Sequence, residues 1–408
     1  MAGQKLKAPR GTFDVLPDQG ALRRDLTLRA DDLLAAAGYG VIDTPVFEHT
    51  ELFARGVGET TDIVQKEMFT FEDMGGRSLT LRPEGTAAVV RAYLEHGMQK
   101  LPQPVKLRYQ GPFFRHEAPQ AGRYRQFTQI GAEAIGSDDP SVDAELIVLL
   151  HELLRDARGI RLRIGSLGTP ETRREYSDDL RAHLRRHEAD LSDEVRSRIE
   201  ANPLRAFDSD HPGTRRVMGN APRLLDRIAP DDAEHFAAVR SMLDAAGVPY
   251  EVDPTLVRGL DYYTRTVFEF TSDALGAQSG VAGGGRYDLL AEQLGGAPTP
   301  GVGWAAGVER ILLATGTPAR GDTGVDVFIA SEHGVTAVQF KFLNDLRASG
   351  KRALIEQAGR SLKGQLKQAN RVGAAKVVIV TADEVRVRDM DSGDTQVVAT
   401  LEDAARLV

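Results

Sequence analysis

Two strand-like runs, at 105–110 and 127–134, lie on either side of a polar loop, and this segment constrains the fold more than any other part of the chain. The alternation in the second run places Gln129, Gly131 and Glu133 on one face of a strand. Arginines, carboxylates and aromatic residues stand between the runs. Arginines in such surroundings are suited to hold and polarise a polyphosphate. The leading hypothesis is therefore an enzyme that activates its substrate with a nucleotide.

The bulk properties are those of a globular chain with more than one domain. Its 408 residues exceed a single compact core, so we expect two or three domains. No stretch approaches the roughly 20 apolar residues of a membrane-spanning helix, and the N-terminus lacks the apolar core of a secretory signal. The absence of cysteine excludes disulfides, thiolate zinc sites and cysteine nucleophiles. We expect a cytoplasmic protein with no membrane partner.

The charge and the histidines narrow the classes of ligand. A net charge of −8 argues against indiscriminate binding of polyanions, but it leaves room for a local, shaped RNA site. The 9 histidines show no metal-ligand spacing, so the side chains predict no metal centre.

The residue patterns divide the chain into a long first part and a small last domain. Residues 1–320 mix helical and strand patterns around a helical insertion at about 168–248. Strand patterns resume over 256–270, and a helix is predicted for 304–315. In residues 321–408 strands and helices alternate as in a separate α/β domain with a mixed sheet.

Arg115 is the first candidate for an anion-binding residue. Its guanidinium can bind a phosphate through two parallel hydrogen bonds, and Glu117 on the same strand face can accept from an exocyclic amine or hold a metal. The alternative is a simple ion pair on a strand. Arg123 and Arg125 on the following loop, with Phe127 able to stack on a purine, favour the ligand site.

Arg258 and the pair Tyr262 and Tyr263 form a second cluster. An arginine among Leu, Val and Gly on a strand is expected to be at least half buried, so it requires a fixed anion. The alternative is a buried salt bridge to Glu269 or Asp261. The tyrosines either pack or present hydroxyls to a ligand.

Three further motifs carry weaker signals. Arg310 lies early in a helix after a glycine-rich strand, where it either faces a ligand or lies on the helix surface. Glu84 and Thr86 at a strand-to-helix turn can grip a substrate ammonium, or they can cap the helix. The run 283–288 lacks the residues of a P-loop, so we interpret it as close backbone packing near a ligand.

The last domain contains a basic helix face. Its cations recur at spacings of three, four and four, opposite an apolar face. Such a face is either solvated or an RNA contact. The four cations are Arg360, Lys363, Lys367 and Arg371.

Together, these motifs resemble class II aminoacyl-tRNA synthetases, and specifically the histidyl-tRNA synthetase family, over nearly the whole chain. The resemblance implies a class II catalytic domain with a mixed, mainly antiparallel sheet flanked by helices, a helical insertion, a C-terminal α/β anticodon-binding domain and a homodimer. The matching segments are 10–17, 45–69 (the dimer-forming motif), 111–133, 256–263, 283–288 and 307–310.

The resemblance also implies roles in ATP binding. Arg115 and Arg258 would hold the α-phosphate as the catalytic residues, with Arg258 stabilising the charge of the transition state. The remaining contacts would be Arg310 with the γ-phosphate, Arg123 with the outer phosphates, and Phe127 with the adenine, near Glu117.

For the amino acid, the resemblance implies a pocket that recognises histidine. Glu84 and Thr86 would bind the α-ammonium, and Gln129 would lie on the carboxylate side. The imidazole would be read by Glu133, Tyr262 and Tyr263, with Tyr287 as an additional candidate.

The implied reaction has two steps. Histidine and ATP give histidyl-adenylate and pyrophosphate, with Mg²⁺ shielding the phosphates, and the histidyl group then passes to the 3′ end of tRNA(His). Gln120 and the basic helix face would contact the tRNA. The family often has a basic residue where this chain has Ala118, so reading of the tRNA acceptor end is expected to differ.

A second interpretation is a non-catalytic regulatory subunit of histidine biosynthesis. Such relatives keep the fold but lack the last domain and lose the histidine-specific arginine. This chain retains Arg115, Arg258, Arg310 and a last domain, which favours the enzyme.

Overall fold

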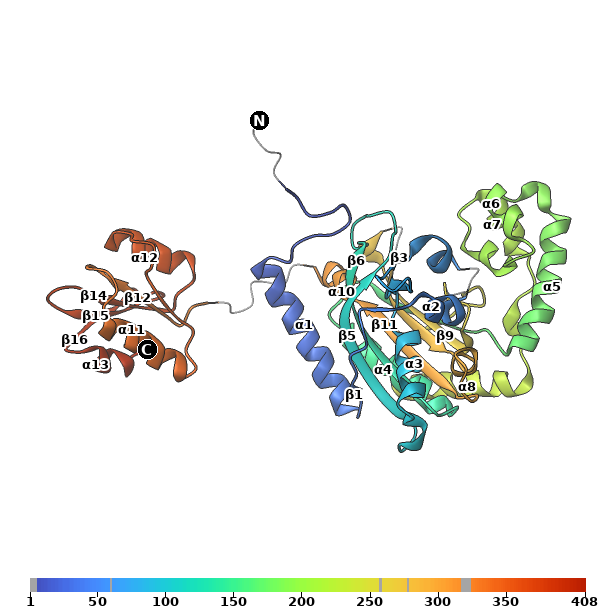
Figure 1. Ribbon diagram of the computed structural model, residues 1–408, viewed down its shortest axis with the longest axis horizontal. Coiled ribbons are helices and arrows are strands. Elements are labelled where there is room, and N and C mark those ends of the chain that lie inside the picture. The colour runs from blue at the N-terminus through green and yellow to red at the C-terminus, as the bar shows by residue number, and fades with distance from the viewer. Residues whose placement is uncertain (1–5, 59–60, 257–258, 277–278, 317–323) are drawn as a thin grey trace. The chain divides into compact units, whose positions relative to one another are not determined.

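The computed structural model forms two compact units, residues 1–317 and 318–408 (Figure 1). No helix in the described part of the chain is both long and apolar enough to cross a bilayer. The structure describes residues 6–58, 61–256, 259–276, 279–316 and 324–408.

An eight-stranded mixed sheet organises the first unit. Its strands are β1 (Gly40–Val41), β5 (Val105–Phe114), β6 (Gln126–Ile135), β7 (Ile160–Ser166), β8 (Glu251–Val252), β9 (Thr264–Ser272), β10 (Gly280–Arg286) and β11 (Gly301–Gly307). The spatial order is β1-β5-β6-β11-β10-β9-β7-β8. Only the outermost pairs, β1 with β5 and β7 with β8, run parallel. The predicted mixed, mainly antiparallel sheet is confirmed.

Helices cover both faces of this sheet (Figure 1). They are α1 (Pro17–Ala36), α3 (Thr86–Glu95), α4 (Pro140–Leu153), α8 (Pro230–Ala245), α9 (Leu290–Gln293) and α10 (Val308–Thr315). The side chains of α1, α4, α8 and α10 share one core with Ile130 and Ala132 of β6. Those of α3 and α9 belong to a second core with Leu107 and Tyr109 of β5. Because strand residues alternate, Glu133 faces away from the first core.

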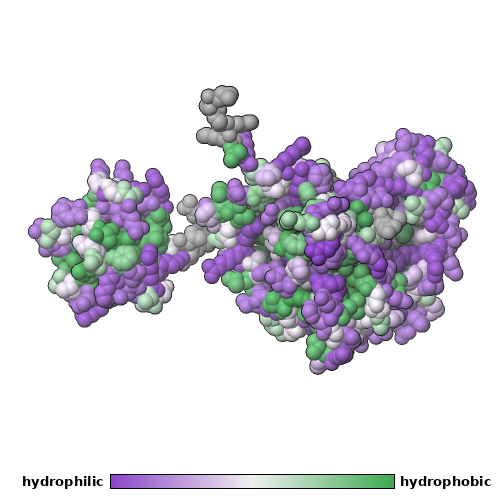
Figure 2. All heavy atoms as spheres, in the orientation of Figure 1, coloured by the Kyte–Doolittle hydropathy of each residue, from purple (hydrophilic) through white to green (hydrophobic). Residues whose placement is uncertain are grey.

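Residues 168–248 are folded mainly into helices. These are α5 (Pro170–Arg186), α6 (Asp193–Arg198) and α7 (Pro212–Gly219), followed by α8. A proline stands in the first turn of α5, α7 and α8, where its missing N–H costs no helical hydrogen bond. The surface over α5, α6 and α7 is mostly hydrophilic on the face shown in Figure 2.

A small antiparallel sheet lies beside the large one. It consists of β2 (Phe47–His49), β3 (Phe69–Glu72) and β4 (Ser78–Leu81) in the order β2-β4-β3, and helix α2 (Thr50–Val57) follows β2. On its inner side the Thr80 hydroxyl lies 2.9 Å from those of Thr50 and Thr70. The outer side exposes 50% of Phe47 and 43% of Phe71, whose ring centroids are 6.2 Å apart. The sheet therefore presents an apolar surface to solvent.

The second unit is a separate α/β fold. Its strands are β12 (Val327–Ser331), β13 (Ala353–Ile355), β14 (Lys376–Val380), β15 (Val385–Asp389) and β16 (Thr395–Val398), and its helices are α11 (Ala337–Ala348), α12 (Leu362–Arg371) and α13 (Leu401–Ala405). The order is β13-β12-β14-β15-β16, with β12 parallel to both its neighbours. Alternate residues of β12 pack toward α11 (Ile329) and toward α12 (Phe328).

Two predicted elements were wrong in their extent. The strand expected over 256–270 begins only at Thr264, since 259–263 form turns, and Arg258 and its neighbour Val257 lie outside the described residues. The helix expected over 304–315 begins at Val308, because residues 304–307 pair with β6 and β10 as part of β11. Cross-strand pairing overrode the local helical pattern there.

Candidate active site

A cavity of about 230 Å³ lies against the central strands of the large sheet. Its lining brings together residues of β6, β9, β10, β11 and α10, the start of α3, the loop after β5 and the turns before β9. Segments more than two hundred residues apart in the chain, such as those of Glu84 and Arg310, thus meet in one site. The predicted residues among the lining are Glu84, Thr86, Arg115, Glu117, Arg123, Phe127, Gln129, Tyr262, Tyr263 and Arg310.

One end of the cavity concentrates positive charge. Arg115 follows β5 directly, and its Nε donates to the carbonyl of Pro83 at 2.9 Å. Glu117 lies between two guanidinium groups, 2.8 Å from Arg123 and 3.8 Å from Arg115. The Arg115 guanidinium also lies 5.6 Å from the ring centroid of Phe127. A single carboxylate thus holds two arginines at the cavity wall.

Arg310 adds a third cation to this end. Its Nε donates to the carbonyl of Gly280, which fixes the side chain toward the cavity. Burial, and then the neighbouring Arg123 cation, lowers the pKa of Arg310 below its ordinary value. A bound polyphosphate would relieve both effects, since it supplies negative charge where the side chain is desolvated.

The start of α3 supplies the next wall. The Glu84 carboxylate accepts from the N–H groups of Thr86 at 2.7 Å and Ala87 at 3.0 Å. Glu84 is only 3% exposed, and burial raises its pKa. The capping interpretation is confirmed, because this carboxylate accepts from the first N–H groups of α3; the same carboxylate also lines the cavity.

Glu133 lies behind this wall and is not itself a lining residue. It is fully buried and accepts hydrogen bonds from the hydroxyls of Thr86 (2.8 Å), Tyr109 (3.2 Å) and Tyr287 (2.7 Å). Burial raises the pKa of Glu133 to about 8 despite these three donors. Tyr287 likewise lies behind the cavity, with Glu133.

Two glycines create the space for this arrangement. Gly131 is paired with Tyr109, and a Cβ on Gly131 would lie 2.2 Å from Cζ of that ring. Gly303 is paired with Glu133, and its Cβ would lie 1.7 Å from Oε2 of the carboxylate. Only residues without a side chain allow the ring and the carboxylate to cross the neighbouring strands.

Phenols form a further part of the wall. The rings of Tyr262 and Tyr263 are 4.7 Å apart, and Tyr262 is 5.9 Å from Tyr287. Burial raises the pKa of Tyr262 well above its ordinary value, so its hydroxyl stays neutral. Gln129 also faces the cavity, and its buried Oε1 has no hydrogen-bond partner among the described residues. The wall therefore offers neutral polar groups to a ligand.

The remaining predicted residues are either outside the described part of the chain or away from the cavity lining. Arg258 is outside the described residues. Gln120 is exposed and does not line the cavity, although its backbone pairs with Arg123 in a tight turn. The basic residues of α12 belong to the second unit, where they are exposed, and Arg360 also pairs with Glu356 at 3.0 Å.

Sequence reasoning missed two residues of the site. Tyr109 donates to Glu133, but nothing in the local pattern distinguishes it from a packing residue. Glu309 accepts from the Thr128 N–H at 3.0 Å and pairs with Arg23, so it ties α10 to β6 and α1. Its position beside Arg310 was a usable signal.

Comparison with known proteins gives consistent matches along the chain. The sequence profile described as histidyl-tRNA synthetase matches residues 11–311. A histidine–tRNA ligase from Rubrobacter xylanophilus is 49% identical over 95% of both chains. The apo S. aureus histidyl-tRNA synthetase superimposes with a TM-score of 0.81 at 36% identity, covering 99% of each chain.

A further solved structure shares the fold. It is described as an ATP phosphoribosyltransferase regulatory subunit/histidyl-tRNA synthetase from Bacillus halodurans C, and it gives a TM-score of 0.68. It is 21% identical and covers 93% of this chain and 99% of its own, so the likeness concerns the architecture alone.

The buried Glu133 predicts a pH-dependent stability. Its pKa rises from 4.5 to about 8 on folding, so the folded protein holds the proton more tightly and the free energy of unfolding falls as pH rises through this range. Relative to that of Glu133→Gln, the free energy of unfolding of the wild type should fall by about 2 kcal/mol between pH 6 and pH 8. Urea titrations measure this difference.

The control for this measurement is Glu171→Gln, which removes an exposed carboxylate from α5. A difference between wild type and Glu133→Gln that does not change with pH would contradict the assignment.

Proposed function

We propose, for a chain that belongs to the histidyl-tRNA synthetase family, that the cavity joins L-histidine to tRNA(His) at the expense of ATP. The carboxylate of histidine attacks the α-phosphorus, pyrophosphate leaves, and histidyl-adenylate forms. A hydroxyl of the terminal ribose then attacks the activated carbonyl carbon and releases AMP. The observation that carries this proposal is the convergence of Arg115, Arg123 and Arg310 on one cavity with a polar pocket beside them.

The three arginines act on the phosphates in this proposal. Arg115 holds the α-phosphate and stabilises the charge that develops in the transition state, a role that Arg258 shares. Arg310 and Arg123 hold the γ- and outer phosphates, and Phe127 stacks on the adenine near Glu117. The support is geometric, because Arg115 is already fixed by Pro83 and Glu117 before any ligand binds.

The proposal includes Mg²⁺, and the cavity suits it. Glu117 and Glu269 both line the cavity, and Mg²⁺ in phosphate sites is usually bound by one or two carboxylates together with the substrate phosphates. When bound, the ion would neutralise charge on the phosphates.

The polar pocket accommodates histidine. Glu84 and Thr86 bind the α-ammonium, and Gln129 supplies an amide whose oxygen needs a donor. Tyr262 and Tyr263 face the imidazole, and Glu133 with Tyr287 forms the polar layer behind them. An apolar amino acid would leave these buried groups unpaired, which is the strongest form of discrimination.

Positioning and electrostatics carry the chemistry in this scheme. No side chain is required as a nucleophile, because the substrate carboxylate attacks directly and the cavity supplies the orientation. A non-catalytic regulatory role is less supported, since the chain keeps Arg115, Arg310 and the second unit and is 49% identical to a ligase over nearly its full length. The substrates ATP and tRNA favour a cytoplasmic location.

The second unit is proposed as the anticodon-binding domain. On α12, Lys363 and Lys367 are exposed, while Gln365 and Ala369 are buried against the sheet. Lys363, Lys367 and Arg371, together with Arg360 just before the helix, thus form a cationic strip suited to phosphates. Gln120, on the exposed loop beside the cavity, is proposed to meet the acceptor end of the tRNA.

We also propose a homodimer through the small sheet. Phe47 and Phe71 are exposed and in edge contact, which leaves an apolar surface that a second copy would cover. Strand β2 of this sheet, which carries Phe47, lies in the segment 45–69 that resembles the dimer-forming motif of the family.

The central experiment is ATP–pyrophosphate exchange by the purified protein with several amino acids in turn. Exchange should depend on histidine, and Arg115→Ala should lower it by about a hundredfold or more, because it removes a group that binds developing charge. Arg155→Ala is the control, since Arg155 is an exposed arginine paired with Glu152 just after α4.

Two outcomes would refute the assignment. Exchange with another amino acid but not with histidine would contradict the substrate. Full activity of Arg115→Ala would contradict the role of that residue.

The basic face of α12 yields a prediction for tRNA binding. The double variant Lys363→Ala and Lys367→Ala should raise the KM for tRNA about tenfold in aminoacylation and leave histidine-dependent exchange unchanged, because only the tRNA step uses this face. Lys341→Ala on α11 is the matched control, with a lysine 77% exposed and paired to Asp345. An equal effect of the control would show that the face has no special role.

The exposed phenylalanines predict the oligomeric state. Phe47→Glu with Phe71→Glu should convert a dimer into a monomer in sedimentation equilibrium, since four buried charges across a two-fold interface are costly. Phe340→Glu tests the effect of a charge at another phenylalanine that is also 50% exposed. A wild-type protein that sediments as a monomer would refute the proposed interface.

A further inference from the structure

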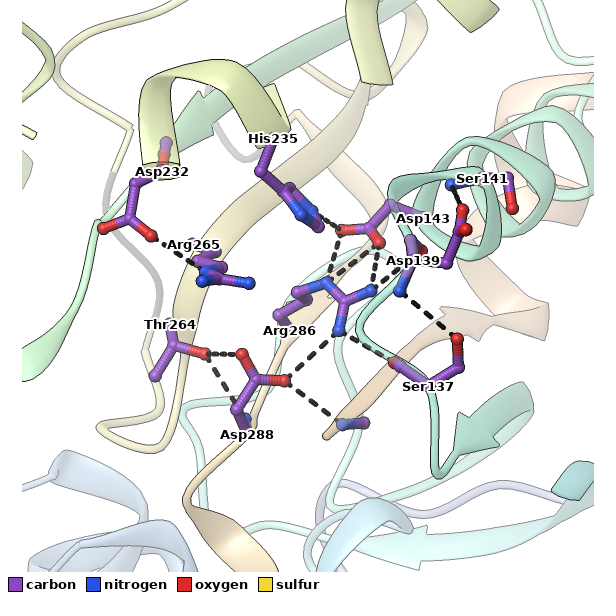
Figure 3. Close-up of polar contacts among 12 residues, drawn as sticks. Ser137, Asp139, Ser141, Asp143, Asp232, His235, Thr264, Arg265, Arg286 and Asp288 are labelled. Carbon is purple, nitrogen blue, oxygen red and sulfur yellow. Dashed lines mark hydrogen bonds and ion pairs between the residues drawn. The ribbon is translucent and has the colours of Figure 1, made fainter. Parts of the chain in front are cut away.

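A buried polar network surrounds Arg286, the residue that precedes Tyr287 in the chain (Figure 3). We call Arg286, Asp143, Asp288 and Thr264 the Arg286 network. Arg286 ends β10, Asp143 lies in the first turn of α4, and Thr264 begins β9. The side chains of Arg286 and Asp143 are both 0% exposed.

Each side-chain nitrogen of Arg286 has a partner. Nε lies 3.0 and 2.9 Å from the two carboxylate oxygens of Asp143, and Nη2 lies 2.7 Å from the second of these. Nη1 donates to the carbonyl of Ser137 at 3.1 Å and to Asp288 at 3.3 Å, and Nη2 also donates to the carbonyl of Asp139 at 3.1 Å. The guanidinium therefore has one fixed orientation.

Asp288 connects the fixed guanidinium to strands β9 and β11. Its Oδ2 accepts from the Thr264 hydroxyl at 3.1 Å, and its Oδ1 accepts from the Gly301 N–H at 3.2 Å. Tyr287 lies between Arg286 and Asp288 in the chain, so hydrogen bonds fix the side chains of both its neighbours. The Tyr287 N–H in turn donates to the Gly301 carbonyl at 2.8 Å.

The network therefore holds residues adjacent to two tyrosines, one in the cavity lining and one behind it. Tyr287 donates to Glu133 at 2.7 Å, and Tyr263, which lines the cavity, immediately precedes Thr264. The same Asp288 carboxylate accordingly links the side chain of Thr264, next to Tyr263, with the backbone of β11 at Gly301.

Helix α8 of the insertion contacts the outer side of this region. His235 Nε2 lies 3.4 Å from Asp143, and Asp232 accepts from Arg265 Nε at 2.8 Å. Arg265 has a φ of +42°, a conformation that is strained for a residue with a side chain and persists only where its surroundings hold it. The ion pair with Asp232 is one such constraint, one residue from Thr264.

A stabilising role alone does not account for the network. Desolvation of a buried ion pair commonly cancels its attraction, and apolar residues of similar size often serve stability as well. What a fully satisfied buried network does provide is a unique geometry. Recognition of an imidazole requires such precision, because hydrogen-bonding groups must be held within about half an ångström.

We propose that Arg286, Asp143 and Asp288 are positioning residues for histidine recognition. They hold Tyr287 against Glu133 and set the start of β9 so that Tyr263 faces the substrate. They do not touch the substrate or ATP. This inference rests on the proposed function, since it concerns the amino acid that the cavity takes.

The test is histidine-dependent exchange by full-length variants, with KM measured separately for histidine and ATP. Asp288→Ala should raise the KM for histidine by about tenfold or more and change the KM for ATP by less than about twofold. The reason is that the variant displaces Tyr263 and Tyr287 but not the arginines proposed to bind ATP. Asp288→Asn keeps the acceptor for Gly301 and a partner for Thr264, so it should restore most of the affinity. A residue needed only for stability would give neither the split nor the rescue.

Glu145→Ala is the matched control. Like Asp143, Glu145 lies on α4, and it does not line the cavity. Like Asp288, it accepts from a cation, Lys106 at 2.7 Å, and from a hydroxyl, Tyr39 at 3.0 Å. Its removal should leave both KM values unchanged. If Asp288→Ala fails to fold, Thr264→Val removes a single hydroxyl and should still raise the histidine KM by about threefold.

The outcomes separate the two claims. A wild-type protein without histidine-dependent exchange overturns the proposed function, and the inference falls with it. An active wild type whose Asp288 and Thr264 variants leave the histidine KM unchanged, or raise both KM values equally, overturns the inference alone. So does a Glu145→Ala variant that shows the same split.

Discussion

The pairing register of β6 with β5 and β11 determines where the polar groups of the cavity lie. It sets Glu133 against Gly303, so the carboxylate occupies space that a Cβ would fill. A carboxyl buried this deeply is costly unless donors reach it. Thr86, Tyr109 and Tyr287 supply those donors from α3, β5 and the segment after β10. The recognition end of the cavity is thus assembled around one strand.

Charge divides the cavity into two ends with different physical character. At one end Arg115, Arg123 and Arg310 line the cavity, and Glu117 pairs with the first two, so three cations lie where a polyanion can bind. At the other, burial keeps phenols neutral and raises the pKa of Glu133. A triphosphate suits the first end, and an amino acid with a polar ring suits the second. Because both ends are shielded from bulk water, electrostatic interactions with a ligand are stronger at each end than they would be in solution.

The packing behind the cavity connects the helical insertion with the strands of the large sheet next to the tyrosines. Helix α8 closes the insertion and also packs against α4, where His235 approaches Asp143. Arg286 then connects α4 to Asp288 and the strands next to the tyrosines. The insertion is therefore not an independent appendage of the sheet, since its last helix takes part in the layer that supports the pocket.

The sequence by itself determined the family, the cationic and polar residues of the site, and much of the second unit, where strands and helices alternate around a mixed sheet as predicted. These properties are local, because each motif carries its chemistry in a few neighbouring residues and alternation along a strand is a short-range pattern. Only the tertiary structure decided that Tyr109 reaches Glu133, that Arg286 is fully enclosed, and that β9 begins at Thr264. Those facts depend on pairing between strands that are far apart in the chain, and no local pattern encodes which residue will stand opposite which.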